Sequence, residues 1–455
     1  MRARGQGLLT VALLGAIVLG SVGIDRLGAK APAELASGTA PSGAWFCPHG
    51  GGPDWSASVY LANPGENDVD ARLTSLGEGR AEPGETVTVP AGGEVRLPAP
   101  AAELGSSSYV EYFGGWIAAG WVTRGASREA GVGAEPCAPT AGRSWFSSGV
   151  STAQGERGSL VVMNPFGADA VFDVAIFAAS RQPVRPSRLR DVTLAPERSL
   201  DIKLNTFAEG ESALSVEVQT SSGRVAVATT VQSKASGIAS VLAWPSTSRS
   251  AVLPTISGGQ STLSLAVPTD GASVAGAQLL TEQLPRPVGE LTGQSLEPAS
   301  AALFPVVTGE NASVDVTVQE GEPIVAALRT TGPGSDDGAS GGAFGPASAW
   351  VVLPALGGEP ARPLLLLANP GDAAASVTLR LLPLDGGQGE VTIEVPAATL
   401  VSAPASLLAG APDAAVLVTS QGSPIVAGSA TTSLGRDGRS VFALAAGVPI
   451  PQQNG

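Results

Sequence analysis

The sequence predicts an all-β protein of four tandem immunoglobulin-like β-sandwich modules that follow an N-terminal transmembrane helix. Three observations support this fold class. The chain repeats itself with a period near one hundred residues, short segments alternate apolar and polar residues, and one long apolar run stands at the start. A closed, β-propeller-like arrangement is the alternative, although a propeller blade holds four strands in only about 40–50 residues.

Residues 1–24 have the features of a signal anchor. Two arginines precede a charge-free run from Gly5 to Ile24. A helix of about twenty residues spans about 30 Å, the thickness of a bilayer core. The positive flank predicts a single pass through the cell membrane with the bulk of the chain extracytoplasmic. Cleavage near Ala31 would instead give a secreted protein. Residues 25–44, rich in Pro, Ala, Ser and Gly, are predicted to be a flexible tether.

The repeat is defined by three landmarks that recur in the same order. The first is an Asn-Pro turn after an apolar segment, at Asn63, Asn164 and Asn369, with Val267 in a degraded copy; the steps between these positions are 101, 103 and 102 residues. The second is a tryptophan near the head of each unit, and the third is a small apolar segment near its end. The tryptophans are Trp45, Trp145, Trp244 and Trp350, and the small segments begin at Trp116, Arg224, Pro323 and Pro424.

Within a unit the pattern is that of β-strands. Residues 377–381 and 391–395 alternate apolar and polar side chains, which is typical of a strand with one solvated face. About seven such strands per hundred residues fit an immunoglobulin-like sandwich. We interpret each Asn-Pro as a turn rather than a ligand-binding tip, and each tryptophan as a core residue rather than a sugar platform. The predicted modules are 45–140, 141–247, 248–345 and 346–450.

These motifs carry a resemblance. A Trp-led strand, Leu-Ala-Asn-Pro-Gly, Val-Pro-Ala and Pro-Ile-Val-Ala, with the opening Trp45-Phe46-Cys47-Pro48, resemble an uncharacterised family of secreted or membrane-anchored proteins of high-GC Gram-positive bacteria with tandem Asn-Pro-Gly β-sandwich repeats. The resemblance covers essentially the whole chain. It implies an envelope protein, and it assigns no catalytic or binding residues.

Two cysteines, Cys47 and Cys137, bracket the first module and predict a disulfide in an oxidising compartment. Closing a loop of this length stabilises a fold by about 4–5 kcal/mol in the chain-entropy treatment. A metal pair is the alternative, but it lacks further ligands.

Composition argues against several activities. A formal net charge of −14 does not suit nucleic acid. The chain has one histidine, His49, within a His-Gly-Gly-Gly segment like a lipase oxyanion turn, and residues 338–342 fit a nucleophile elbow on paper. The elbow lacks its strand–helix context, and no histidine follows position 49. We therefore predict no enzyme, no cofactor, no catalytic residue and no metal site, and interpret the loop acids as solvated rather than as calcium ligands. A carboxylate-dependent carbohydrate-active hydrolase stays open, because two of the 40 acids could converge.

One segment is a candidate anion-binding site. Residues 181–190 hold four arginines and two prolines, which predicts a hairpin loop. It belongs to the one module that is not acidic. Guanidinium groups bind phosphate and carboxylate, as found in envelope polymers and lipid headgroups; a solvated loop balanced by Glu197 and Asp173 is the alternative. The candidate residues are Arg181, Arg185, Arg188 and Arg190.

Together these features predict a non-enzymatic cell-envelope protein, an extracytoplasmic scaffold or binding module anchored in the membrane. Its expected partners are the membrane, through the N-terminal helix, and an envelope polymer or envelope protein. A structural spacer or assembly partner of a membrane complex is the further alternative.

Overall fold

The computed structural model describes residues 42–451, apart from short gaps. The gaps are 126–130, 180, 235–236, 256–258, 333–336, 343–344, 355–360, 383–389, 404–406, 408–410, 412–413 and 435–439. The predicted anchor (1–24) and nearly all of the tether (25–44) therefore lie outside the described residues. Ser42–Gly455 is a single compact unit made of antiparallel sheets.

The first eight strands form two four-stranded sheets, ordered β1-β6-β3-β4 and β5-β2-β7-β8. Their bounds are β1 (Ser42–Cys47), β2 (Trp55–Ala62), β3 (Val69–Leu76), β4 (Glu82–Val89), β5 (Glu94–Ala99), β6 (Ser107–Phe113), β7 (Ala118–Gly125) and β8 (Gly131–Pro136).

The next eight strands form the sheets β12-β11-β14-β9 and β13-β10-β15-β16. They are β9 (Ser144–Val150), β10 (Glu156–Asn164), β11 (Ala170–Ala178), β12 (Val192–Leu194), β13 (Arg198–Lys203), β14 (Leu214–Ser222), β15 (Ala226–Ser233) and β16 (Gly237–Leu242), with the short 3₁₀ helices η2 (Ser187–Leu189) and η3 (Leu204–Thr206).

The third set forms the sheets β17-β22-β19-β20 and β21-β18-β23-β24. Its strands are β17 (Ser250–Thr255), β18 (Gln260–Val267), β19 (Ser273–Thr281), β20 (Arg286–Leu296), β21 (Ser300–Val306), β22 (Ala312–Gly321), β23 (Val325–Thr331) and β24 (Asp337–Ser340).

The last set forms the sheets β28-β27-β30-β25-β33 and β29-β26-β31-β32. Its strands are β25 (Ala349–Val352), β26 (Ala361–Asn369), β27 (Ala375–Leu382), β28 (Val391–Val395), β29 (Thr399–Ser402), β30 (Ala415–Gly422), β31 (Val426–Leu434), β32 (Ser440–Ala446) and β33 (Val448–Pro449). The all-β prediction is confirmed, and each set of strands supplies two sheets that pair in the same order.

The two sheets of a set share one apolar core. In the third set, Leu263 and Leu265 of β18 belong to the same buried cluster as Val314 and Val316 of β22, which is in the other sheet. These side chains alternate along their strands because successive residues of a strand face opposite sides.

The strand order matches the immunoglobulin order only in part. As in an immunoglobulin domain, the second strand of each set pairs with the fifth and the third with the sixth. The first strand, however, pairs with the sixth and the seventh with the second, whereas immunoglobulin domains pair first with second and sixth with seventh. The difference lies in the strands that flank the central pairs.

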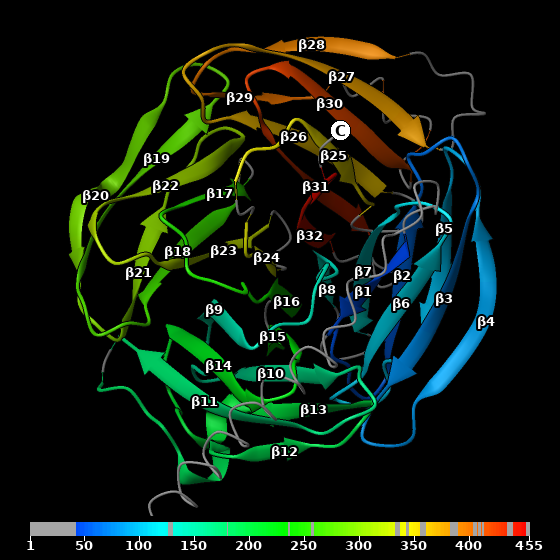
Figure 1. Ribbon diagram of the computed structural model, residues 1–455. Coiled ribbons are helices and arrows are strands. Elements are labelled where there is room, and N and C mark those ends of the chain that lie inside the picture. The colour runs from blue at the N-terminus through cyan, green and yellow to red at the C-terminus, as the bar shows by residue number, and fades with distance from the viewer. Residues whose placement is uncertain are drawn as a thin grey trace, which may run out of the picture. The chain divides into compact units, whose positions relative to one another are not determined.

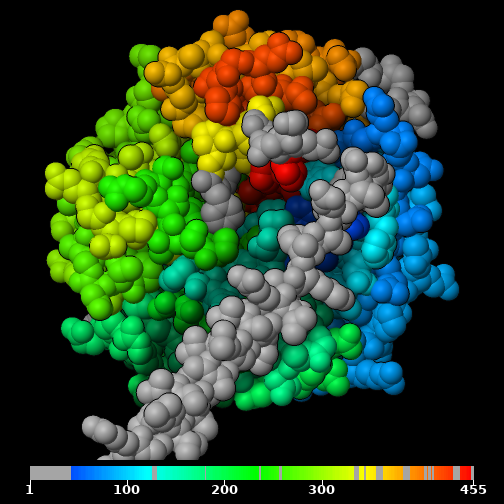
Figure 2. All heavy atoms as spheres, viewed as in Figure 1, coloured from blue at the N-terminus to red at the C-terminus, as the bar shows by residue number. Residues whose placement is uncertain are grey.

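The last strands of four sheets contact one another within the Ser42–Gly455 unit. β8 and β24 each contact both β16 and β32, and Figure 1 shows these four strands toward the middle with β4, β12, β20 and β28 at the periphery. The contacts are close: a Cβ at Gly133 of β8 would lie 2.3 Å from the Ser240 Oγ of β16. In Figure 2, successive parts of the sequence occupy successive sectors of the visible face.

The Asn-Pro landmark closes the turn after the second strand of its set. Asn63 Nδ2 donates to the carbonyl oxygens of Asn67 (2.8 Å) and Val89 (3.1 Å), while its Oδ1 accepts from the Gly65 amide (3.0 Å). Asn164 and Asn369 make the equivalent bonds in the second and fourth sets. The interpretation as a structural turn therefore agrees with the geometry.

The tryptophan landmark needs one correction. Trp45, Trp145 and Trp350 occupy one register position in the first strand of their sets, but Ala251 occupies it in β17. Trp244 lies earlier, after β16, and pairs with Phe146. Its ring still enters the buried cluster that contains Ala251, so the third set fills this core position from a different point of the backbone.

Candidate functional site

The arginine-rich segment lies in the hairpin loop between β11 and β12. The backbone of Val184 pairs with that of Ile176, and Leu189 in η2 is buried. These two contacts hold the loop against the sheet edge, and all four arginines are exposed. The predicted hairpin loop is thus where the sequence placed it.

Three of the four arginines lie beside carboxylates. Arg181 Nε donates to Glu211 Oε1 at 2.8 Å. Arg185 and Arg190 line a pocket of about 140 Å³ together with Asp173, Glu217 and Gln219, and Arg188 is not part of its lining. Burial raises the pKa of Glu217, and the charge of Arg185 opposes this shift. The structure therefore places arginine and acid together, and anion binding by the loop stays a prediction.

A second polar pocket lies between the second and third sets of strands. It has a volume of about 240 Å³ and contains an ion pair between Arg329 of β23 and Glu156 of β10, at 2.5 Å. Burial would raise the pKa of Glu156, but the hydrogen bond and charge of Arg329 together with a hydrogen bond from Ser151 outweigh it, so the net shift is downward. Ser148 and Ser264 join the same two sets through their hydroxyl groups, 2.7 Å apart.

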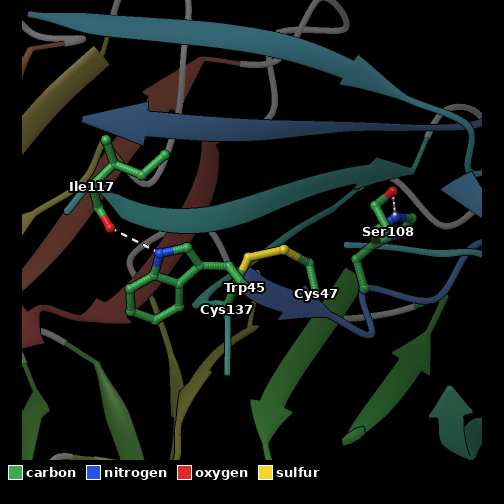
Figure 3. Close-up of a disulfide and its surroundings, with 6 residues drawn as sticks. Trp45, Cys47, Ser108, Ile117 and Cys137 are labelled. Atoms are coloured by element: carbon green, nitrogen blue, oxygen red, sulfur yellow. Dashed lines mark hydrogen bonds between the residues drawn. A yellow bond between two sulfur atoms is a disulfide. The ribbon is translucent and has the colours of Figure 1, made fainter. Parts of the chain in front are cut away.

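Cys47 and Cys137 form the predicted disulfide (Figure 3). It joins the end of β1 to the residue just past β8, next to the backbone pairing of Phe46 with Ala138. The corresponding place in the second set is closed by the backbone pairing of Phe146 with Trp244. The disulfide therefore fixes, in the first set, a closure that the second set makes with hydrogen bonds.

His49 is buried in this corner and does not resemble a general base. Its Nδ1 lies 2.7 Å from the Gly50 carbonyl oxygen and its Nε2 lies 3.1 Å from Ser108 Oγ. Burial lowers the pKa of His49 to about 4. The imidazole is thus neutral at physiological pH and both of its nitrogens have partners inside the protein.

The recurrent tryptophans are buried rather than presented to a ligand. The indole Nε1 of Trp45 donates to the Ile117 carbonyl oxygen at 2.8 Å (Figure 3). Trp145 and Trp350 donate in the same way to Val225 and Ile425. The three acceptors all belong to the third landmark, the small apolar segment. The tryptophan motif and this segment therefore recur together because they are hydrogen-bonded to each other.

Sequence reasoning missed the most deeply buried carboxyl group of the described residues. Glu135 of β8 is 4% exposed and accepts hydrogen bonds from the backbone amides of Gly341 and Leu242, which belong to the third and second sets. Burial raises the pKa of Glu135 well above its ordinary value, although both hydrogen bonds lower it. The sequence offered no signal beyond an acid in an otherwise apolar segment.

The part of the chain that the structure describes lacks both a metal-ligand cluster and a membrane-spanning helix. It holds no group of three or more His, Cys, Asp or Glu side chains placed to bind a metal ion. Its helices are also too short or too polar to cross a membrane.

Fold and site define an all-β protein of paired antiparallel sheets with one disulfide. The chain belongs to a family of unknown function (DUF5719), whose sequence model matches residues 113–356. No curated protein matches its sequence. One solved structure, described as "Crystal structure of tetra-tandem repeat in extending region of large adhesion protein", is 10% identical and covers 90% of this chain and 100% of its own, with a TM-score of 0.11. That score is too low to support an inference.

Proposed function

We propose that this protein is a non-enzymatic, exported component of the cell envelope that presents exposed loops on a rigid scaffold. In this proposal residues 1–24 anchor it, 25–44 tether it, and four sandwich modules form the extracytoplasmic part. The contacts among β8, β16, β24 and β32 support a closed, propeller-like arrangement of those modules rather than an open string.

The observation that carries the proposal is that the recurrent residues make their contacts within the fold and are not free to bind a ligand. The asparagines lock turns and three of the four tryptophans bind the apolar segment of their own set, all of them buried. A repeat preserved in this way specifies packing and turn geometry. The cluster of four arginines in residues 181–190 belongs to the second set alone and lies at the surface, where it is available to a partner.

Export is supported by the disulfide, because such bonds persist in oxidising compartments. A carbohydrate hydrolase is less well supported. Such enzymes use two carboxyl groups about 5–10 Å apart, and Asp173 and Glu217 do share a pocket. However, Asp173 Oδ1 already accepts a hydrogen bond from the Asp191 amide at 2.7 Å.

Cell fractionation followed by capture from the native envelope tests the proposal. The full-length chain is expected in the membrane fraction, accessible to protease added outside, and cross-linked to an envelope polymer or protein. A mature N-terminus near Ala31 would show that the protein is secreted after cleavage and is not anchored in the membrane. Recovery in the cytoplasm with two free thiols, or release of reducing sugar from envelope polysaccharide, would contradict the proposal.

A further inference from the structure

The pocket under the arginine loop has a counterpart in the third set of strands. Glu217 immediately precedes the valine that pairs with Trp145, and Asp315 immediately precedes the valine that pairs with Ala251. Since Trp145 and Ala251 share one register position, the two acids do as well. Asp315 lines another pocket, of about 380 Å³, on the equivalent sheet of the third set, β17-β22-β19-β20.

An Arg-Pro pair lies near each acid, at nearby but not identical positions of the repeat. Arg185-Pro186 and Arg286-Pro287 lie 101 residues apart, whereas the turn positions of the second and third sets, Asn164 and Val267, lie 103 residues apart. Each arginine lines its pocket after the third strand of its set. The proline fixes φ and supplies no backbone N–H, which keeps the segment out of the sheet ladder or at its edge.

Both acids are held in partly desolvated positions. Asp315 is 9% exposed and its Oδ2 accepts a hydrogen bond from Gln278 Nε2 at 2.9 Å. Burial raises the pKa of Asp315, as it does that of Glu217. Placing a carboxyl in such a site costs free energy, and a pair of such sites at one register position calls for an explanation other than solubility.

The first and fourth sets do not repeat this arrangement. Tyr109 stands at the position of the acid in the first set and Leu417 in the fourth. The duplicated acid therefore marks the second and third sets, which both fall within the residues matched by the family.

The chemistry of the pockets favours a hydroxyl-rich ligand over a polyanion. Arg185 and Arg190 face Asp173 and Glu217 in one pocket, and Arg286 accompanies Asp315 in the other, so neither carries excess positive charge. Carboxylate, amide and guanidinium groups are planar and offer paired hydrogen bonds that match neighbouring hydroxyls.

We propose that these two pockets form a duplicated binding site for a neutral, hydroxyl-rich polysaccharide, with the larger pocket at Asp315 as the principal subsite. This inference rests on the proposed function as an envelope binding module. The larger pocket has the size of ordinary small-molecule sites, whereas the pocket at Glu217 is smaller than most. Two weak subsites on one chain bind a polymer better than either binds a monosaccharide.

The test is affinity electrophoresis of the detergent-solubilised full chain in gels containing dextran, mannan or galactan, with polygalacturonate as the anionic probe. Retardation by at least one neutral polymer is expected. Asp315→Asn with Arg286→Gln should weaken it about tenfold or more, since several hydrogen bonds are lost, and Glu217→Gln with Arg185→Gln by a smaller factor. The matched control is Arg72→Gln with Glu111→Gln, which removes an exposed ion pair from the equivalent sheet of the first set.

The outcomes separate this inference from the proposed function. Retardation by a neutral polymer that neither pair of substitutions changes would overturn the duplicated site and leave an envelope-binding role intact. Retardation by polygalacturonate alone would replace the neutral ligand with an anionic one and overturn the inference. Absence of retardation by all four polymers, with capture from native envelope still positive, would also overturn it while the proposed function stands.

Discussion

Replacing Asn63 with alanine tests whether the repeated Asn-Pro turn is a structural lock. The side chain is 1% exposed and uses both of its amide protons and its carbonyl oxygen in hydrogen bonds within the first set. Alanine removes all three bonds at once. It also leaves the Gly65 amide and the Val89 carbonyl without these partners.

The expected loss follows from those contacts. A neutral hydrogen bond contributes about 1 kcal/mol net, and a buried group left unsatisfied costs about 1–3 kcal/mol. Because water reaches part of the turn, where the hydrogen bonds to Asn67 and Gly65 are only partly buried, we expect Asn63→Ala to lower the free energy of unfolding by about 2–4 kcal/mol. The substitution Asn67→Ala changes an exposed side chain in the same turn and should stay within about 0.5 kcal/mol.

Urea unfolding of parent and variants, followed by tryptophan fluorescence, measures the difference. A chain of several sets of strands can unfold in more than one step, so amide hydrogen exchange at residues 63–67 and 89–93 should localise the effect to the turn. A loss for Asn63→Ala no larger than that for Asn67→Ala would refute the reasoning. The recurrent asparagine would then need a role in binding instead.

Three further predictions concern the disulfide, the buried acid and the arginine loop. Reduction, or Cys47→Ala with Cys137→Ala, should lower stability by up to about 4–5 kcal/mol; equal urea midpoints with and without reductant would contradict this. Because the folded pKa of Glu135 is raised, its stabilisation is complete below the ordinary carboxyl pKa and is lost as pH rises through the folded value, by up to about 1.4 kcal/mol per pH unit. Glu135→Gln should remove that slope, and an unchanged pH profile would count against it. Changing the four loop arginines to Gln should leave stability nearly unchanged and, if the loop binds anions, weaken co-sedimentation with anionic envelope material and reduce its salt dependence; identical curves across a salt series would leave the loop as solvated surface. The four are Arg181, Arg185, Arg188 and Arg190.

The Asn-Pro period could be read from the sequence because one side chain makes the whole turn. Asn63, Asn164 and Asn369 bond to groups within their own turn and to the end of the second strand that follows, 26 to 30 residues away, so the repeat unit itself contains most of the information. The same holds for the disulfide, since two cysteines in a module leave one pairing. Features of this kind can be recognised in the sequence without knowledge of the tertiary structure.

The tryptophan landmark does not mark one register position in all four sets, and the spacing along the sequence already showed this difference. Trp244 precedes its turn position by 23 residues, whereas the other three tryptophans precede theirs by 18 or 19. A buried core site accepts an indole ring from any backbone position that reaches it, and Trp244 Nε1 donates to the Gly341 carbonyl oxygen at 2.7 Å instead of to the third landmark. Residue type recurred here while register did not.

The paired pockets could not be predicted because they depend on which strands are neighbours. Glu217 and Arg185 lie 32 positions apart, and their proximity arises only when β14 pairs with β11 and the loop folds back onto that sheet. Alignment of the repeat by its turn positions, Asn164 and Val267, places Arg185 opposite Val288, two residues past Arg286. The sequence therefore showed an Arg-Pro pair in both sets, but the equivalence of the two acids required the registers of β14 and β22.

The contacts among β8, β16, β24 and β32 explain why these strands differ from ordinary edge strands. An exposed edge invites pairing with other chains, and proteins usually blunt it with charge, proline or a bulge. β8 and β16 carry glycine, alanine and serine, and nearly all of these residues are buried. A larger side chain at Gly133 would strike Ser240, and one at Gly131 would strike the backbone of Gly237 and Ile238. Small residues here allow the sheets to cover one another's edges, so the edge is protected by a neighbouring set of strands. Such a chain resists association through its interior strands and leaves its outer sheets, where both pockets lie, as the surface through which partners are met.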